Sequence, residues 1–317
     1  MKRIFVTGGS GFIGAGVINE LVKDKYKIIC FDNYFRGGKD KFSKNTKGIK
    51  FVKGDVRDLK SLIKYSKNCD MILHLAFING TKYFYEKPDL VLDVGVKGMI
   101  NVIEATKINK IRELIVASSS EVYQTPEVVP TLENERLIVP DVHNPRYSYG
   151  GGKIISELLS LHACPHLKRV IIFRPHNVYG PNMGNEHVIP EFLNRLKKLI
   201  NINKNKGPIN FKILGDGNQI RAFNFISDFA EGVKLLIKKG KHKNIYHIGD
   251  DRKYKIKDII KELSKIHRIK IKIINKRSPV GETKVRCPNI NKMRKLGYKP
   301  KVNIKKGLKI TSDWYFK

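Results

Sequence analysis

Residues 3–14 read RIFVTGGSGFIG, a short apolar run that leads directly into a glycine-rich turn. The apolar residues that follow recur with a helical period up to about residue 23. In a strand–turn–helix of this kind the first glycine permits the tight turn, the second lets a pyrophosphate approach the backbone, and the third lets the helix pack closely. The helix N-terminus then offers unpaired N–H groups to phosphates. The segment therefore predicts a dinucleotide site that contains Gly8, Gly11, Phe12, Ile13 and Gly14.

Strands and helices alternate through the first half of the chain. The strand candidates are KIICFD (27–32), IKFVKGD (49–55), MILHLAF (71–77), ELIVASSS (113–120) and RVIIFRPHNVYG (169–180). Helical candidates run from about 88 to 109 and over 148–163. This alternation predicts βαβ units and a parallel sheet covered by helices on both faces. After residue 180 the pattern loosens, so we expect an α/β fold, a Rossmann-type doubly wound parallel sheet with a smaller C-terminal α/β substrate-binding lobe.

The balance of charge is strongly basic. The 317 residues include 62 Lys and Arg against 29 Asp and Glu, which gives a formal net charge of +33. Such a charge suggests either a nucleic-acid partner or a surface enriched in lysine. The lysines are scattered, no nucleic-acid motif is present, and the densest cluster, RIKIKIINK (268–276), alternates like a half-buried strand. We therefore favour the lysine-rich surface, whose positive field would attract anionic small molecules.

The absence of long apolar runs and the spacing of the cysteines indicate where the protein is located and whether it binds a metal. No apolar run approaches the roughly 18 residues that a membrane span needs, and no signal segment is recognisable, so we expect a cytoplasmic protein with no membrane partner. The four cysteines stand far apart with no CxxC pair, which predicts buried free thiols and no metal site.

Polar residues at the ends of the next strands predict how a dinucleotide would be held. Asp32 ends the second strand, where a carboxylate accepts hydrogen bonds from the adenosine ribose and repels a 2′-phosphate, which favours NAD over NADP. Arg36 would argue the other way, although a surface position is the simpler interpretation, and an Asp-Asn turn is the alternative for Asp32 itself. Asp55 can meet the adenine or cap its own loop. The predicted cofactor residues beyond the glycine loop are Asp32, Asn33, Asp55, Val56, Leu75 and Ala76.

Tyr149 and Lys153 are four residues apart in YGGGK, which places both side chains on one face of a helix. A phenol is a poor base at neutral pH, but a nearby ammonium and a nicotinamide cation lower its pKa. Tyr149 could then accept a hydroxyl proton while hydride leaves the same carbon. Ser119, at the end of the fifth strand, would hydrogen-bond the reacting oxygen, or would belong to a serine-rich turn with no chemistry.

Together these motifs resemble the extended short-chain dehydrogenase/reductase family, in its nucleotide-sugar epimerase/dehydratase branch. The resemblance runs nearly end to end. It includes TGGSGFIG (7–14), GDVRD (54–58), HLAF (74–77), SSSEVY (118–123), YGGGK (149–153), RPHNVYGP (174–181), GDGNQIRAFNFISD (215–228) and RCPNINKMRKLGYKP (286–300).

The resemblance implies an activity and a set of residues. Bound NAD oxidises the sugar of a nucleoside-diphosphate sugar, usually at C4, and the ketone permits inversion, dehydration or decarboxylation. Ser119, Tyr149 and Lys153 would be catalytic, with Tyr149 and Lys153 also contacting the cofactor. The implied substrate-binding residues are Ser120, Asn177, Arg221 and Arg286, the arginines holding the diphosphate or nucleotide. The family habit also implies a homodimer through helices at about 88–109 and 149–165.

We expect the chain to divide into two parts. Residues 1–175, with about 222–250, would form the NAD-binding Rossmann domain. Residues from about 176 to 221 and from 251 to 317 would form the nucleotide-sugar-binding lobe.

The chain departs from the family at two helices. Three glycines separate Tyr149 from Lys153 where many relatives have alanine or serine, and each glycine costs a helix about 1 kcal/mol relative to alanine. Gly95 stands where the family commonly has asparagine, in the sequence Asn-Val-x-Gly-Thr. The contacts that this asparagine makes in relatives are therefore missing.

Glu121 decides between reactions. Simple 4-epimerases often have an uncharged residue there, whereas 4,6-dehydratases resemble this chain in having a glutamate that serves as base. The Ser-Glu pair is also similar to nucleotide-sugar decarboxylases, for which Arg286 could hold the sugar carboxylate. We expect an NAD-dependent nucleotide-sugar epimerase, with dehydratase and then decarboxylase as alternatives, and a non-catalytic NAD-binding sensor or scaffold as the contrasting class. Glu121 is a catalytic candidate, with a role as a buried hydrogen-bonding partner as the alternative. His176 and His187 are expected to be structural.

Overall fold

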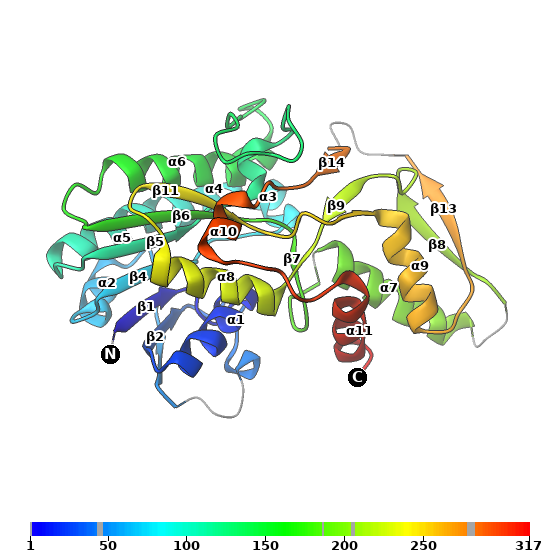
Figure 1. The fold of residues 1–317 in the computed structure, drawn as a ribbon, viewed down its shortest axis with the longest axis horizontal. Helices are drawn as coiled ribbons and strands as arrows, with labels where there is room; N and C mark the ends of the chain where they lie inside the picture. Colours follow the sequence, from blue (N-terminus) through cyan, green and yellow to red (C-terminus); the bar gives the residue numbers. More distant parts are fainter. Residues whose placement is uncertain (1, 43–46, 186, 204–206, 278–282) are drawn as a thin grey trace.

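Seven parallel strands form the central sheet of the protein, whose computed structural model describes residues 2–42, 47–185, 187–203, 207–277 and 283–317. The strand order is β11-β6-β5-β4-β1-β2-β3 (Figure 1). The strands are β1 (Arg3–Thr7), β2 (Lys27–Asp32), β3 (Ile49–Lys53), β4 (Met71–His74), β5 (Glu113–Ala117), β6 (Arg169–Pro175) and β11 (Asn244–Ile248). The order reverses between β1 and β4, and in such a sheet ligands bind outside the carboxyl ends of the strands at this point. The predicted fold class is confirmed.

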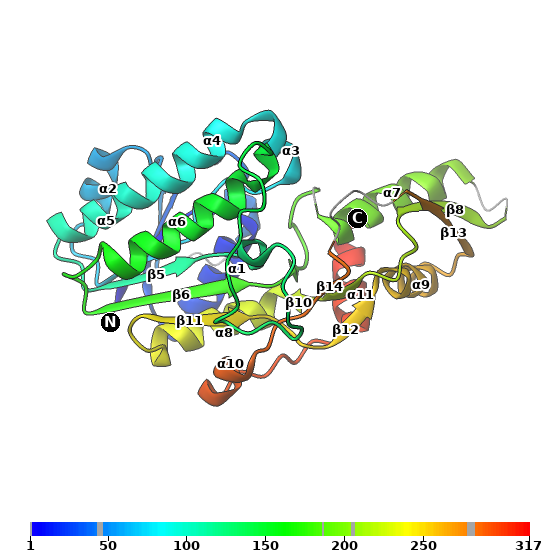
Figure 2. The same cartoon turned by 90° about the horizontal axis from the view of Figure 1, so that it is seen from above.

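Helices cover both faces of the sheet, because its strands are apolar on both sides (Figure 2). One layer contains α1 (Phe12–Leu21), α8 (Ile226–Lys239) and α10 (Asn291–Leu296). The other contains α2 (Leu59–Ser66), α3 (Thr81–Glu86), α4 (Pro88–Leu92), α5 (Gly98–Ile108) and α6 (Ser148–His162). The three glycines after Tyr149 lie within α6, which is unbroken.

A single turn of π-helix, Asp93–Lys97, joins α4 to α5. The predicted helix over 88–109 is therefore present, with a wider turn in its middle that the sequence pattern did not indicate. π turns inside helices occur frequently at functional sites. Gly95 stands at the centre of this one.

A smaller α/β lobe follows the sheet in the chain and lies at its carboxyl-terminal edge (Figure 1). Its helices are α7 (Val188–Asn203), α9 (Ile256–Ile266) and α11 (Ile304–Tyr315). Its strands form small sheets of β8 (Ile209–Leu214) with β13 (Ile271–Lys276), and of β9 (Ile220–Ala222) with β12 (Lys253–Lys255) and β14 (Val285–Arg286). β7 (Val178–Tyr179) pairs with β10 (Asn224–Phe225) where the chain crosses between the two parts.

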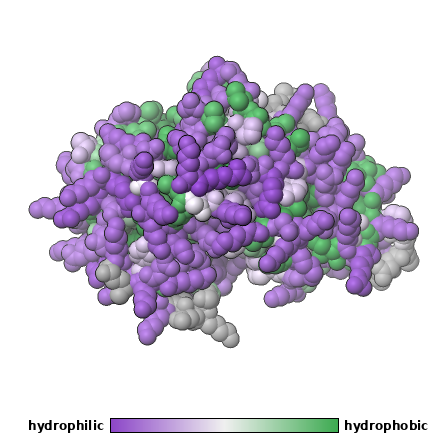
Figure 3. Space-filling view, in the orientation of Figure 1, coloured by the Kyte–Doolittle hydropathy of each residue, from purple (hydrophilic) through white to green (hydrophobic). Residues whose placement is uncertain are grey.

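The surface and the cysteines agree with the composition. All four cysteines are buried and free, as predicted. β13 has exposed lysines and half-buried isoleucines, as its alternating pattern indicated. Hydrophilic residues cover most of the face in Figure 3 without gathering in one place. Among the described residues, no helix combines the length and the apolar character needed to cross a membrane.

Candidate active site

The glycine loop leaves room for a phosphate group because any side chain there would collide with backbone. Gly8 has a φ of +66°, and a Cβ built on it would lie 2.7 Å from the backbone nitrogen of Ala76. A Cβ on Gly14 would lie 2.3 Å from the carbonyl oxygen of Gly8. The first turn of α1 contains no acidic side chain, so its N–H groups face the pocket without competition from a carboxylate.

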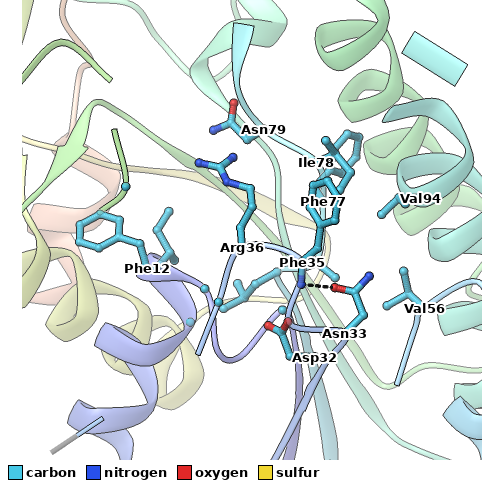
Figure 4. Close-up of a pocket in the computed structure, with 18 of the residues that line it drawn as sticks. Phe12, Asp32, Asn33, Phe35, Arg36, Val56, Phe77, Ile78, Asn79 and Val94 are labelled. Atoms are coloured by element: carbon cyan, nitrogen blue, oxygen red, sulfur yellow. Dashed lines mark hydrogen bonds between the residues drawn. The ribbon is translucent and has the colours of Figure 1, made fainter. Parts of the chain in front are cut away.

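A pocket opens from this loop across the carboxyl ends of β1, β2 and β4 (Figure 4). The structure brings together in its lining every cofactor residue that the sequence predicted outside α6. These residues are Gly8, Gly11, Phe12, Ile13, Gly14, Asp32, Asn33, Asp55, Val56, Leu75 and Ala76. The lining also contains residues that the sequence did not indicate, among them Phe35, Phe77, Asn79 and Val94.

Asp32 and Arg36 bear on the choice between NAD and NADP. The Asp32 carboxylate accepts hydrogen bonds from the N–H groups of Ser10 (2.9 Å) and Tyr34 (2.7 Å). Arg36 is exposed, as expected, but it also lines the pocket. Its guanidinium points toward Asn79 and away from Asp32 (Figure 4). It is therefore not arranged to bind a phosphate beside Asp32, and the ribose end of the pocket fits NAD.

Asp55 serves its own loop and also lines the pocket. Its carboxylate accepts hydrogen bonds from the Arg57 backbone (2.9 Å) and guanidinium (2.9 Å) and from the Asn33 amide (3.0 Å). Hydrogen bonds from Arg57 lower the pKa of Asp55 to about 2. The carboxylate is thus ionised and fixed at the place where the sequence predicted an adenine contact.

A second pocket adjoins the first and contains the predicted reacting groups. Its lining includes Ser119, Ser120, Glu121, Tyr149, Lys153 and Asn177. Tyr149 and Lys153 lie one turn apart on α6, and both are buried. Residues 120–123 form a short 3₁₀ turn, in which the Ser119 hydroxyl accepts a hydrogen bond from the Glu121 N–H (3.1 Å).

Burial shifts the pKa values of Tyr149 and Lys153 on α6 in opposite directions. Burial raises the pKa of Tyr149 to about 12, although a hydrogen bond with the Ser119 hydroxyl opposes this. Burial lowers the pKa of Lys153 to about 7, against the influence of Glu157. The Lys153 ammonium donates to the carbonyl oxygen of Ala117 (2.6 Å). The tyrosine therefore needs added positive charge to become a base, and an ammonium and a nicotinamide cation beside it act in that direction.

Glu121 forms an ion pair with Arg286, which comes from β14 in the lobe. Both guanidinium nitrogens of the fork face its two carboxylate oxygens, the longer contact being 3.4 Å. Burial raises the pKa of Glu121, but Arg286, with the charges of Arg146 and Arg221, outweighs burial and lowers it. Glu121 is thus held as a carboxylate between arginines.

The predicted substrate residues are only partly assembled. Asn177 lines the second pocket with a φ of 39°, and its amide donates to the Ala222 carbonyl (2.9 Å). Arg221 and Arg286 are neighbours on paired strands, but neither is part of the lining of the two pockets. Arg286 reaches the site through Glu121.

Sequence reasoning missed several residues around the second pocket. Arg146, in the short turn Pro145–Tyr147 before α6, lines it, as do Phe77, Phe84 and Gln124. Phe84 stacks on the Tyr149 ring with centroids 4.9 Å apart. His187 lines both pockets, and burial lowers its pKa. Arg146 carried a signal in the sequence, since it stands three residues before Tyr149, as did Phe77, which belongs to the HLAF segment.

The family model described as the NAD dependent epimerase/dehydratase family matches residues 4–249. The chain belongs to this family. NAD is accordingly its cofactor, in agreement with the fit of the glycine loop and Asp32. The family supports NAD-dependent modification of a nucleotide sugar and leaves the particular reaction open.

Individual relatives span different reactions. The chain is 28% identical to a UDP-N-acetyl-alpha-D-glucosaminuronate decarboxylase of Bacillus cytotoxicus, over 99% of this chain and 98% of the relative. It is 30% identical to the human dTDP-D-glucose 4,6-dehydratase, over 99% of this chain and 90% of the relative. The structure of a UDP-N-acetylglucosamine 4-epimerase from Methanobrevibacter ruminantium superposes with a TM-score of 0.87 at 24% identity, covering 99% of this chain and 98% of that one. The last likeness shows the fold alone.

Proposed function

We propose that the protein is an NAD-dependent nucleotide-sugar epimerase that inverts a sugar carbon, C4, through transient oxidation. The observation that carries the proposal is the convergence of Ser119, Tyr149 and Lys153 in the second pocket, which adjoins the cofactor pocket. NAD, when bound, supplies the hydride acceptor and donor. A sugar hydroxyl placed against Tyr149 would also meet the Ser119 hydroxyl.

The residues of the chain have separate parts in this reaction. Tyr149 accepts the hydroxyl proton at its phenolate oxygen, Ser119 holds the same sugar oxygen by a hydrogen bond, and the Lys153 ammonium stabilises the phenolate. The same phenol returns the proton when the carbonyl is reduced from the other face. No further acid or base is required, so the site is sufficient for inversion.

The ion pair of Glu121 argues against dehydration. A 4,6-dehydratase needs a base at C5, and a carboxylate that already shares an arginine fork is a weaker base than a free one. The lowered pKa of Glu121 also makes it a weaker base, since it favours the ionised form over the protonated one. Glu121 with Arg286 therefore supports a positioning role in the wall of the sugar pocket.

Incubation with UDP-, GDP-, CDP- and dTDP-sugars, followed by NMR of the products, tests the proposal. The expected result is a sugar inverted at C4 with no net formation of NADH. A 4-keto-6-deoxy product would overturn the proposal in favour of the dehydratase.

A second candidate, an enzyme for an acidic sugar, is favoured by Arg146. Among the described residues the Arg146 guanidinium makes no hydrogen bond or ion pair, although it lines the pocket three residues before Tyr149. Its charge acts on Glu121, but its guanidinium is not tied to that carboxylate, and a guanidinium in the lining of the pocket fits a carboxylate on the sugar. Oxidation at C4 would make such a uronate a β-keto acid, whose C5–C6 bond can break with release of carbon dioxide and with the electron pair moving to the C4 oxygen. The decarboxylase from B. cytotoxicus has a uronate substrate by name.

Kinetics with UDP-glucuronate and UDP-glucose separate the two candidates. If the sugar is acidic, Arg146→Gln raises KM for the uronate by roughly ten- to a hundredfold and leaves the neutral sugar little changed. Arg195→Gln, a lobe arginine paired with Glu191, is the matched control. Turnover of the neutral sugar alone, unaffected by Arg146→Gln, would dispose of the second candidate.

We also propose that the active form is a homodimer, with a second copy covering the outer face of α4, α5 and α6. Large apolar side chains are exposed along this face: Leu92, Ile100, Ile108, Ile155 and Leu158. A group of hydrophobic residues is visible over α6 in Figure 3. Light scattering should give twice the chain mass for the wild type and the mass of one chain for Leu158→Lys. A monomeric wild type would contradict this proposal.

A further inference from the structure

Phe77 occupies the boundary between the cofactor pocket and the sugar pocket. It follows β4 in the segment HLAF, and it lines both pockets. Figure 4 shows Phe77 among the residues that line the cofactor pocket, beside Ile78. Neither the dinucleotide motif nor the Tyr149–Lys153 motif includes this residue.

The ring fills space that two glycines leave open. A Cβ built on Gly95 would lie 2.2 Å from the Phe77 Cζ atom, and a Cβ on Gly152 would lie 3.1 Å from the same atom. Gly95 belongs to the π turn and Gly152 to α6, so the ring edge is held between two helical segments. The bulk of Phe77 therefore gives one physical reason for Gly95 and for Gly152, the last of the three glycines.

The face of the same ring meets the catalytic lysine. The Lys153 nitrogen lies 4.0 Å from the Phe77 centroid, within the range of a cation–π contact. The Tyr149 ring meets Phe77 edge-on, with centroids 5.2 Å apart. An ammonium has three donors, and among the described residues the Lys153 nitrogen makes one hydrogen bond, to Ala117. The aromatic face adds negative potential beside the carbonyl oxygen of Ala117.

We propose that Phe77 is a positioning residue, whose ring holds the Lys153 ammonium beside Tyr149 in the space left by Gly95 and Gly152. Its consequence for turnover rests on the proposed function, but its contact with Lys153 does not. The other groups that face Lys153 are Glu157 one turn along α6, Tyr149, and His74 on β4. His74 is neutral, since burial and the Lys153 charge lower its pKa to about 3. Among the described residues its Nε2 atom has no hydrogen-bond partner, so it does not bind the ammonium in place of the ring.

Replacing the ring by an aliphatic side chain tests the contact with Lys153. In Phe77→Leu the pKa of Lys153 should fall by about half to one and a half units, the range expected for loss of a partly buried cation–π contact. The probe is the ¹³Cε resonance of labelled lysine that titrates near pH 7 and is absent in Lys153→Arg. Phe5→Leu is the matched control, because Phe5 is buried in the same apolar cluster and makes no contact with Lys153.

The pH profile of kcat should move with the lysine. A less cationic Lys153 stabilises the Tyr149 phenolate less, so the pH below which kcat falls should rise in Phe77→Leu by a similar amount. Phe5→Leu should lower Tm and leave both the titration and the profile in place. A Phe77→Leu enzyme that loses Tm but keeps the wild-type Lys153 pKa and pH profile would show a packing role only, and would overturn the proposal.

A double-mutant cycle tests the shared space without any substrate. Gly95→Ala alone should lower Tm, because its Cβ collides with the ring. In a Phe77→Ala background the same change should be neutral or should raise Tm, since alanine favours a helix over glycine. Additive effects would contradict the packing argument. If no sugar is turned over by any variant, the proposed function fails, while the lysine titration and the cycle still decide the inference.

Discussion

The cofactor pocket and the sugar pocket differ in what forms them, backbone in the first and side chains in the second. The first is made largely of backbone: the turn at Gly8, the close approach at Gly14 and the N-terminus of α1. The second brings together side chains from distant segments, among them Glu121, Tyr149 and Lys153, and Glu121 is paired to Arg286, 165 residues away. A site made of backbone is specified by a local motif, whereas a site made of side chains exists only after folding. The cofactor can thus be inferred from a short stretch, and the sugar cannot.

The sharpest test of this contrast removes one oxygen from the side-chain site. Tyr149→Phe should lower kcat by on the order of 10²- to 10⁴-fold, because the proton of the sugar hydroxyl loses its acceptor. NAD binding, which depends mainly on backbone, should change little. Stopped-flow turnover and NAD titration measure the two effects. Turnover near the wild-type rate would show that the reacting group lies elsewhere.

The reverse change damages the backbone site. Gly14→Val should abolish detectable NAD binding, because its Cβ would stand 2.3 Å from the Gly8 carbonyl oxygen in a turn that cannot yield. Calorimetric titration with NAD gives the result. Gly151→Ala is the matched control, since its Cβ would meet only Val139 at 3.6 Å. The contrast between the pockets breaks if Gly14→Val binds NAD normally.

A smaller effect is expected from the ion pair in the sugar pocket. Glu121→Gln keeps the shape of the side chain but leaves Arg286 without its carboxylate, so we expect a loss of roughly tenfold in kcat/KM. A general base at C5 would cost on the order of a thousandfold. Product assays on a common substrate distinguish the two magnitudes, and a thousandfold loss would restore the dehydratase.

The smallest effect concerns stability and pH. Burial lowers the pKa of Lys153 from its ordinary 10.5 to about 7, so between these values the unfolded chain binds a proton that the folded chain lacks. Folded stability from this group therefore rises with pH over that window and is lowest below pH 7. Lys153→Met should raise Tm by roughly 2–4 °C at pH 6, and the gain should shrink toward pH 10. Calorimetry across pH measures it. An equal change in Tm at both ends would contradict the buried-ammonium argument.

The sequence placed residues at the pockets where neighbours in the chain are also neighbours in space, and the roles of these residues stay predictions. The glycine loop, the strand-end carboxylates and the Tyr149–Lys153 spacing are local, and all of them reach the two pockets. The π turn could not be foreseen, because Phe77, whose ring lies against Gly95 in this turn, is 18 positions earlier in the chain and touches it only in the fold. The pairing of Glu121 with Arg286 could not be foreseen either, because the two residues lie 165 positions apart in the chain.

Alternation of strands and helices predicted the central sheet, and the pattern of 268–276 predicted β13, but the shortest strands of the lobe were not predicted. β10, β12 and β14 have two or three residues each, too few for a periodic pattern. Arg286 stands on β14 and Arg221 on the three-residue β9, so their position relative to the pockets depends on pairings that no local pattern encodes.

The most direct test of transient oxidation at C4 is the reaction run in D₂O with an accepted nucleotide sugar and followed by NMR. Inversion through hydride removal and return at one carbon keeps the sugar's own hydrogen, so the account predicts an inverted product with no deuterium at C4 or C5. Deuterium at C5 would mean that a proton or a carboxyl group leaves that carbon. It would contradict the epimerase and assign Glu121 or Arg146 to a different reaction.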